Sequence, residues 1–344
     1  MKPSLNGVIF GTGLSFEEQV RLASDVGFAG IDTGIEAIAH LIDQRGLTGA
    51  REFFDACAVQ PAVWGFNVDW RGSNDSYRES LDGLTRWAEV AREIGCPRCC
   101  TWLPPSVDDA AALRKLAVKR FRESAEILAA QGCRLGLEWV GPKTSRQSGQ
   151  EFIYRMDQLL EMIDEIGRPN VGLLVDSFHW FTAGHTVEEL VRVPKERVVH
   201  VHINDAPDRP RDEQIDMERL LPGEGVIDLA GFLGALRQIG YDDYMGVETF
   251  SAELKALTPS RRPGEPKPLW IACSEPTGST GRGRELAERG GPVARPPRRS
   301  GMTPGSAERS SCTPRNDSIP YTAPVRGRLP PRRRGQSPRK RARR

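Results

Sequence analysis

Four short apolar segments of the sequence lead into a side chain that can bind a metal ion or carry a proton. They are Glu138 after RLGL, Asp176 after VGLLV, His202 within VVHVHI and Glu248 after MGV. Three carboxylates held together in a partly dry site repel one another, and each such charge costs kilocalories. A divalent cation removes that cost. One nitrogen and three oxygen donors, with no thiolate among them, suit Mn²⁺, Mg²⁺, Co²⁺ or a zinc site with room for substrate.

The segments that carry these residues belong to a regular alternation along the chain. Eight strand-like apolar runs alternate with seven longer stretches whose apolar residues recur at helical spacing, and many of these stretches end at glycine. Such alternation predicts a parallel sheet. Eight repeats without a leftover strand favour the closed α/β barrel, the (β/α)8 TIM barrel. Because the carboxyl ends of its strands form one mouth, we expect the four residues to meet there.

The competing fold is an open doubly wound sheet, which usually carries a dinucleotide site after its first strand. The sequence FGTG at residues 10–13 lies in the expected place, but the third glycine of that motif is absent. Asp32 is the only acidic residue placed to bind a ribose. We therefore reject a dinucleotide site and keep the barrel.

The remaining residues with chemical potential lie near the four strand ends. Alternation along the strand points His200 inward, one layer deeper than His202, as core packing or as support for that residue. His179, three residues after Asp176, is expected above the barrel, in contact with metal or substrate. Trp64 could form an apolar wall against a sugar ring or belong to the core, and the sequence leaves both interpretations open.

The charge pattern divides the chain in two. Residues 259–344 hold 21 basic and 6 acidic side chains, whereas residues 1–258 hold 27 basic and 40 acidic ones. The helical pattern stops near Thr258 and gives way to Arg, Pro, Gly and Ser. We predict a barrel domain over residues 1–257, with a truncated eighth helix, and a disordered basic tail over 258–344. We interpret the tail as a frameshifted or non-homologous extension.

Composition also bears on location and partners. The seven cysteines form no disulfide framework, no apolar run reaches the length of a membrane span, and the N-terminus lacks a signal-peptide pattern. We expect a cytoplasmic protein with no membrane partner. The acidic body argues against a specific nucleic-acid partner. A truncated eighth helix would expose apolar strand faces, which favours a homodimer.

The strand-end motifs GLE, VDSFH, HVHIND and GVET, with LPGEGVIDLAGFLGAL after the third, carry a family resemblance. From about residue 5 to residue 257 the chain resembles the xylose isomerase-like TIM barrels of the sugar phosphate isomerase/epimerase superfamily. The resemblance implies that four residues bind one divalent metal ion, with Mn²⁺ the expected metal: Glu138, Asp176, His202 and Glu248.

The same resemblance assigns roles in the reaction. Glu138 and Glu248 become the acid/base pair, and His179 hydrogen-bonds a substrate hydroxyl. The family usually places an arginine in the loop after the seventh strand, where Arg209 and Arg211 are the candidates.

The implied activity is isomerisation or epimerisation of a small sugar, sugar phosphate or polyol-derived ketone. Proton transfer would pass through an enediolate that the metal stabilises. A leaving group β to the carbanion would make the same site a dehydratase or lyase of the inosose or dehydroshikimate type. The less favoured alternative is an apurinic/apyrimidinic endonuclease, which requires further histidines at the ends of the second and third strands. These ends read IDTG and FNVDW.

Overall fold

Eight parallel strands close into a barrel in the computed structural model, which describes residues 1–10, 13–146 and 148–250. The barrel forms because the last strand pairs with the first, Lys2 opposite Tyr244. The predicted fold class is therefore confirmed. In barrel order the strands are β1 (Lys2–Asn6), β2 (Gly30–Thr33), β3 (Gln60–Gly65), β4 (Arg98–Trp102), β6 (Arg134–Glu138), β8 (Val171–Asp176), β9 (Val198–Ile203) and β10 (Tyr244–Val247).

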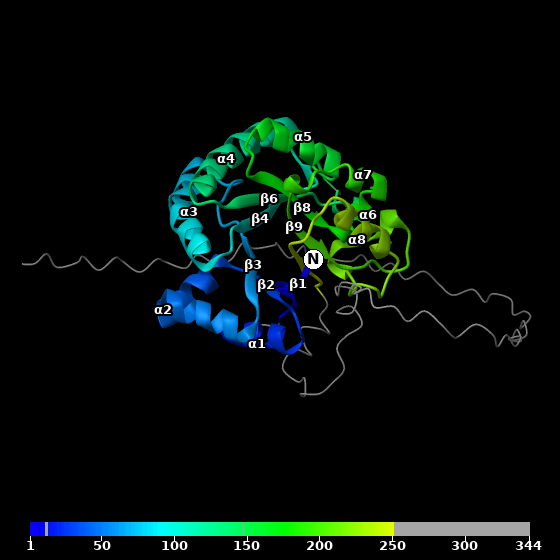
Figure 1. Ribbon diagram of the computed structural model, residues 1–344. Helices are drawn as coiled ribbons and strands as arrows, with labels where there is room; N and C mark the ends of the chain where they lie inside the picture. The colour runs from blue at the N-terminus through cyan, green and yellow to red at the C-terminus, as the bar shows by residue number, and fades with distance from the viewer. Residues whose placement is uncertain (11–12, 147, 251–344) are drawn as a thin grey trace, which may run out of the picture. The chain divides into compact units, whose positions relative to one another are not determined.

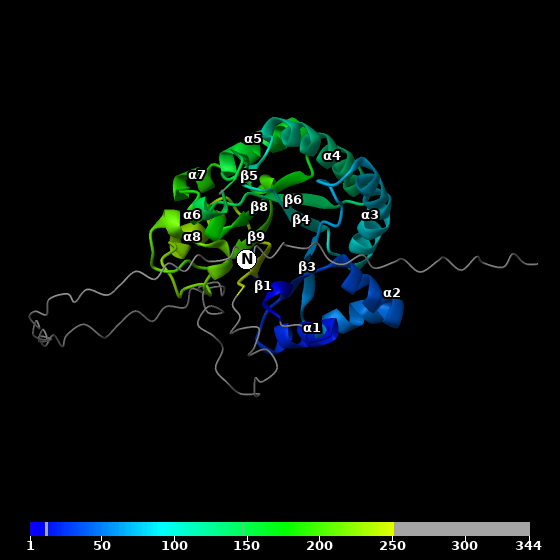
Figure 2. The ribbon, with the colours of Figure 1, turned by 180° about the vertical axis from the view of Figure 1, so that it is seen from behind.

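Helices surround the strands on the outside, as Figures 1 and 2 show from opposite sides. Two further strands, β5 (Ser106–Val107) and β7 (Gln150–Glu151), pair in a small separate sheet. The described helices are α1 (Phe16–Asp25), α2 (Ile35–Cys57), α3 (Asn74–Ile94), α4 (Ala110–Ala130), α5 (Met156–Ile166), α6 (Ser177–Thr182), α7 (Val187–Val191) and α8 (Leu229–Gln238).

Local sequence signals set where several of these helices begin and end. The Ser15 side chain accepts a hydrogen bond from the Glu18 backbone N–H, and the Glu18 carboxylate accepts one from the Ser15 backbone N–H, so this capping box starts α1. Gly95 ends α3 with φ 86° and Gly167 ends α5 with φ 65°. Both glycines adopt the left-handed conformation that other residues enter at a cost, so the predicted glycine caps are confirmed there.

Helix α2 is longer than the sequence pattern indicated. The pattern predicted a helix only from about residue 47, but α2 begins at Ile35 and continues through Gly46, which has φ 70°. Gly46 departs from helical geometry, so α2 consists of two helical segments, and the predicted helix is the segment after that glycine. This break explains why one continuous periodicity was not visible.

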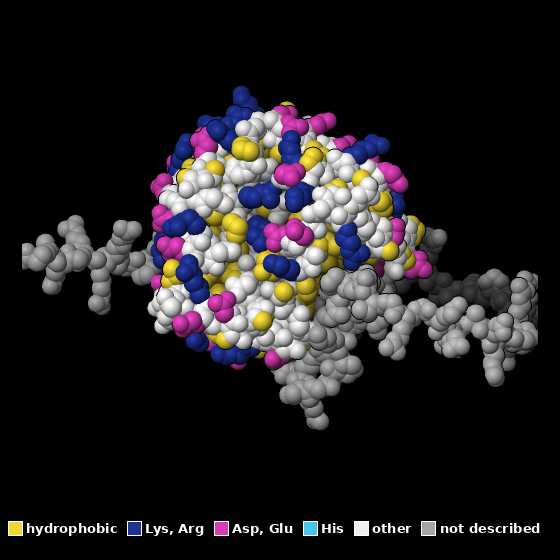
Figure 3. All heavy atoms as spheres, in the orientation of Figure 1, with side chains coloured by type: hydrophobic (Ala, Val, Ile, Leu, Met, Phe, Trp, Pro, Cys, Tyr) yellow, Lys and Arg dark blue, Asp and Glu magenta, His cyan; other side chains and the backbone are white. Residues whose placement is uncertain are grey.

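The strands that carry the four candidate residues lie deep in the molecule. Every residue of β8, β9 and β10 is buried, as expected for strands covered by helices outside and by side chains inside. Acidic and basic side chains are interspersed on the face shown in Figure 3. Among the residues that the structure describes, no helix has the length and hydropathy needed to cross a membrane. The domain boundary at residues 257 and 258, the truncated eighth helix and the basic tail lie outside the described residues.

Candidate metal centre

The four strand-end residues meet at one mouth of the barrel. Glu138 and Asp176 end β6 and β8, His202 is the next-to-last residue of β9, and Glu248 directly follows β10. One ligand atom from each residue lies within 4.8 Å of the others. Each of the four residues is at most 8% exposed. The fold thus collects three carboxylates and one imidazole in a nearly dry volume, the donor set that the sequence predicted.

Two buried atoms of this cluster have no hydrogen-bond partner among the described residues: Glu138 Oε1 and His202 Nδ1. They lie 3.9 Å apart, and Nδ1 is also 3.2 Å from Glu248 Oε2. Buried polar atoms left without a partner are costly, so their convergence needs an explanation. A divalent cation bound by both atoms would provide one, and the donor set therefore fits a metal.

Asp176 is held rigidly by the elements around it. Its Oδ1 accepts the backbone N–H groups of Phe178 at 2.7 Å and His179 at 3.0 Å, because Asp176 is also the N-cap of α6. Its Oδ2 accepts the Asn204 side-chain amide at 2.8 Å. The start of α6 therefore fixes the orientation of the Asp176 carboxylate.

Arg219 supplies a positive charge that the sequence analysis missed. Its Nη1 donates to Asp176 Oδ2 at 3.0 Å and to Glu248 Oε2 at 2.7 Å, and its side chain is only 2% exposed. Nη2 donates to Asp216 Oδ1 at 2.7 Å. The guanidinium therefore partly offsets the negative charge of the cluster. Its loop returns to the mouth because Leu220 pairs with Asp205, just beyond β9.

His179 lies at the edge of the cluster, as expected from its place after β8. Its Nε2 is 3.0 Å from Arg219 Nη2 and 3.9 Å from Glu138 Oε1. Burial lowers the pKa of His179, so the ring is neutral at pH 7. A neutral imidazole beside Glu138 can exchange hydrogen bonds with a ligand hydroxyl.

The two glutamates have opposite protonation tendencies. Burial and the charges of Glu248 and Asp176 raise the pKa of Glu138 well above its ordinary value. Burial also opposes ionisation of Glu248, but His202 and Arg219 outweigh it and hold the pKa of Glu248 at about 2. The two carboxyls therefore differ in how readily they ionise. Such a pair can donate a proton and accept one at the same time.

Beneath the cluster, residues of the first strands support it. Asn6 at the end of β1 donates to Glu248 Oε1 at 3.2 Å. His200 Nε2 lies 3.0 Å from Asp32 Oδ2, and His202 Nε2 lies 3.4 Å from the same oxygen. His200 thus lies one layer below His202, as expected. Asp32 is buried inside the barrel, a position that cannot bind a ribose, and sequence reasoning missed both Asn6 and this placement.

The other three residues predicted to contact substrate, Arg209, Arg211 and Trp64, have partners of their own in the structure. Arg209 pairs with Glu218, and the exposed Arg211 lies with its guanidinium 5.1 Å from the centre of the Phe181 ring. The arginine of this loop that reaches the cluster is Arg219. Trp64 is fully buried and donates its indole N–H to the Cys96 carbonyl at 3.2 Å. It therefore belongs to the core, and the alternative of a wall against the substrate is not supported.

Comparison with known proteins gives the family. The sequence model of the xylose isomerase-like TIM barrel family matches residues 20–270, and the chain belongs to that family. The inosose isomerase of Bacillus velezensis is 27% identical over 229 residues, which cover 65% of this chain and 79% of that protein.

Two solved structures are similar to this one. The xylose isomerase domain protein of Alicyclobacillus acidocaldarius is 29% identical, with a TM-score of 0.68 over 75% of this chain and 95% of that chain. The IolI protein, whose structure contains a zinc atom, is 24% identical, with a TM-score of 0.64 over 75% of this chain and 92% of that chain. The family predicted from the strand-end motifs is thus confirmed, and the named relatives include an enzyme of the predicted isomerase class.

Proposed function

We propose that the protein is a divalent-metal-dependent isomerase or epimerase of a small carbohydrate or polyol-derived ketone. The observation that carries the proposal is the meeting of Glu138, Asp176, His202 and Glu248 within 4.8 Å of one another. These four residues would hold one metal ion, with Mn²⁺ the expected metal and Mg²⁺, Co²⁺ or Zn²⁺ compatible with the same donors. The named isomerase relative supports the class of reaction.

The chain's own residues account for the proton transfer. A bound divalent cation would supply Lewis acidity, which makes a proton next to a carbonyl easier to remove. Glu248 is ionised and accepts the proton, and the electron pair of the broken C–H bond passes to the carbonyl oxygen to give an enediolate. Glu138, whose pKa is raised in the metal-free chain by burial and by the charges of Glu248 and Asp176, returns a proton to carbon. Return to the opposite face of the same carbon re-forms the carbonyl and gives an epimer. Return to the neighbouring carbon gives an isomer, with the hydroxyl proton passing to the former carbonyl oxygen and the former hydroxyl oxygen becoming the carbonyl.

Two groups beside the glutamates would bind and orient the substrate. Arg219 and His179 present nitrogen atoms 3.0 Å apart at the edge of the cluster. A guanidinium and a neutral imidazole suit hydroxyl and carbonyl oxygens, and their burial strengthens each hydrogen bond. Arg219 also neutralises part of the charge that develops on oxygen when the proton leaves.

Solvent-deuterium exchange tests this function. The full chain is incubated with Mn²⁺ in deuterated water with a panel of keto-sugars, their phosphates and inososes, and recovered compounds are analysed by mass spectrometry. We expect one panel member to gain deuterium with the wild type and with Glu165→Gln, a control on α5 that pairs with Arg114. Glu138→Gln and Glu248→Gln should lose the exchange.

Other outcomes would redirect or overturn the proposal. Exchange accompanied by loss of water from the product would make the protein a dehydratase on the same site. Metal-dependent cutting of an abasic duplex would identify a nuclease, although β2 and β3 end at Thr33 and Gly65 rather than at histidine. No exchange with any panel member, in protein shown to bind Mn²⁺, would contradict the proposed reaction.

A further inference from the structure

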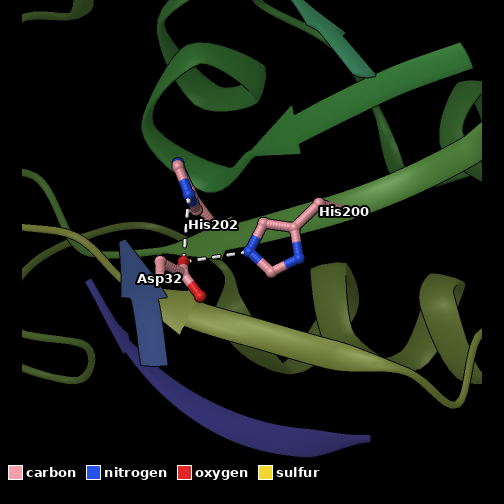
Figure 4. A group of neighbouring side chains, drawn as sticks. All are labelled: Asp32, His200 and His202. Atoms are coloured by element: carbon pink, nitrogen blue, oxygen red, sulfur yellow. Dashed lines mark hydrogen bonds and ion pairs between the residues drawn. The ribbon is translucent and has the colours of Figure 1, made fainter. Parts of the chain in front are cut away.

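Asp32 is a buried carboxylate directly beneath the proposed metal ligands, and the proposed mechanism does not use it. It extends from β2 into the barrel and is 4% exposed. Figure 4 shows the imidazoles of His200 and His202 directed at the same carboxylate oxygen, Oδ2. Ser4 donates its hydroxyl to the other oxygen, Oδ1, at 2.7 Å. Both oxygens of the carboxylate are therefore held by named partners.

The barrel leaves room for this carboxylate at one glycine. Gly246 on β10 is the register partner of His202, and a Cβ built there would lie 2.1 Å from Asp32 Oδ2. Any larger residue would collide with the carboxylate. The glycine thus allows a charged group to enter the layer below Glu248, where an apolar side chain would otherwise fill the barrel.

Both imidazoles approach Asp32 Oδ2 through Nε2, His200 at 3.0 Å and His202 at 3.4 Å. A carboxylate oxygen that faces two ring nitrogens is the acceptor, so the geometry points to a proton on Nε2 of each ring. The Asn6 amide nitrogen also lies 3.4 Å from His202 Nε2, and it donates to Glu248 Oε1 at 3.2 Å.

That constraint fixes how His202 can act. With a proton on Nε2 held by Asp32, the ring turns Nδ1 to the mouth, 3.2 Å from Glu248 Oε2 and 3.9 Å from Glu138 Oε1. Nδ1 is the buried atom without a hydrogen-bond partner. Histidines that bind metals usually donate the other ring N–H to a carboxylate or carbonyl, which fixes the ring and makes it a better donor.

We propose that Asp32 is the positioning residue of the metal centre: its carboxylate holds the His202 ring so that Nδ1, not Nε2, binds the metal, and His200 and Ser4 hold the carboxylate. This inference rests on the proposed function, because it needs a metal at the mouth. The assignment also gives His200 a role: from the deeper layer of the barrel, its ring donates a hydrogen bond to the Asp32 carboxylate.

A second metal ion is the competing explanation, since ligand atoms of Asp32, His200 and His202 also lie within 4.8 Å of one another. The distances favour hydrogen bonds, because both nitrogens approach one oxygen at 3.0 and 3.4 Å. His200 and Asp32 are at most 4% exposed, which leaves little access for the waters that would complete the coordination. The number of metal ions bound per chain decides between the two.

The first test measures Mn²⁺ binding to the full chain by electron paramagnetic resonance. We expect one Mn²⁺ per chain and a 10- to 100-fold weaker dissociation constant for Asp32→Asn, the range typical for loss of such a partner. Ser4→Ala, which removes only the contact to Oδ1, should weaken binding less. Asp243→Asn is the matched control, because Asp243 pairs with Arg98 at 2.9 Å at the amino ends of the strands. Its affinity should equal that of the wild type.

The second test needs no variant and so does not depend on folding of Asp32→Asn. Nitrogen-15 NMR of the Zn²⁺-loaded wild type should show the His202 ring bound through Nδ1 with a proton on Nε2. Metal bound through Nε2, an unchanged affinity in Asp32→Asn, or two Mn²⁺ ions per chain would each overturn the role of Asp32. A wild type that binds no Mn²⁺ and no Zn²⁺ would instead overturn the proposed function, and this inference with it.

Discussion

The two halves of the barrel supply different kinds of polar group to the same small volume. Strands β6, β8, β9 and β10 carry, at or next to their ends, the four residues whose ligand atoms converge: Glu138, Asp176, His202 and Glu248. Strands β1 and β2 supply Asn6 and Asp32, whose polar atoms face those ligands rather than the mouth. Strands β6, β8, β9 and β10 thus present the donors proposed for a cation, and β1 and β2 contact Glu248 and His202, two of those donors. The loop residue Arg219 balances their charge while no metal is bound.

The largest effect should come from removing that balancing charge. Arg219→Ala leaves the carboxylates of Asp176 and Glu248 buried without their cation, and breaking a buried ion pair in this way costs about 3–5 kcal/mol of unfolding free energy. Urea denaturation of the metal-free protein measures the loss. Mn²⁺ should recover part of it, because a metal ion replaces the missing charge.

The matched control is Arg114→Ala, which removes a partly exposed pair with Glu165 and should cost at most about 1 kcal/mol. An Arg219→Ala variant as stable as this control would show that the carboxylates do not need a cation. That result would remove the electrostatic reason for a metal at the mouth.

The next largest effect distinguishes the two histidines of β9: His202, the proposed ligand, and His200, which contacts Asp32. His202→Ala removes a metal donor and should weaken Mn²⁺ binding by about 100-fold or more, whereas His200→Ala removes a partner of Asp32 and should weaken it by about 10-fold. Equilibrium dialysis followed by metal analysis measures both variants. The reverse order would mean that the strand register assigned to β9 is wrong and that the deeper histidine is the ligand.

The smallest expected effect is a change in how the melting temperature of the metal-free protein depends on pH. Since the raised pKa of Glu138 lies above its ordinary value of 4.5, the protonated form is favoured by folding. The contribution of Glu138 to the free energy of unfolding is complete at pH values below its ordinary pKa. This contribution is lost as the pH rises through the raised pKa. Glu138→Gln stays neutral, so its melting temperature should fall less than that of the wild type between pH 5 and pH 9. The expected difference is about 2–4 °C for each kcal/mol.

Glu165→Gln serves as the control for this pH series. Hydrogen bonding to Arg114 lowers the pKa of Glu165, so its removal should not protect the protein at high pH. Parallel melting curves for the wild type and Glu138→Gln across the series would show that Glu138 ionises freely in the metal-free protein.

The meeting of the four strand-end residues could be predicted from the sequence because each ends or follows an apolar run in a barrel whose strand ends share one mouth. Glu138 and Asp176 end their strands as predicted, and the position of His202 follows from the alternation along β9. Arg219 could not be found in this way. It reaches the mouth through a loop that folds back by the pairing of Leu220 with Asp205, and nothing in the local sequence fixes that return.

The position of Asp32 could not be predicted from the sequence either, but for a different reason. A single acidic residue at the end of a short strand is compatible with a surface position, a helix cap or a ligand. Its burial depends on the space above Gly246, which belongs to a strand more than 200 residues away in the sequence. The supports of the site therefore depend on long-range packing, whereas its ligands follow from a local pattern.

Anomalous X-ray scattering from crystals soaked with Mn²⁺ tests the central claim most directly. The account predicts a single manganese peak in contact with Glu138, Asp176, His202 and Glu248, with Nδ1 as the histidine donor. A peak between Asp32 and His200, or a map without manganese at the mouth of the barrel, would contradict it.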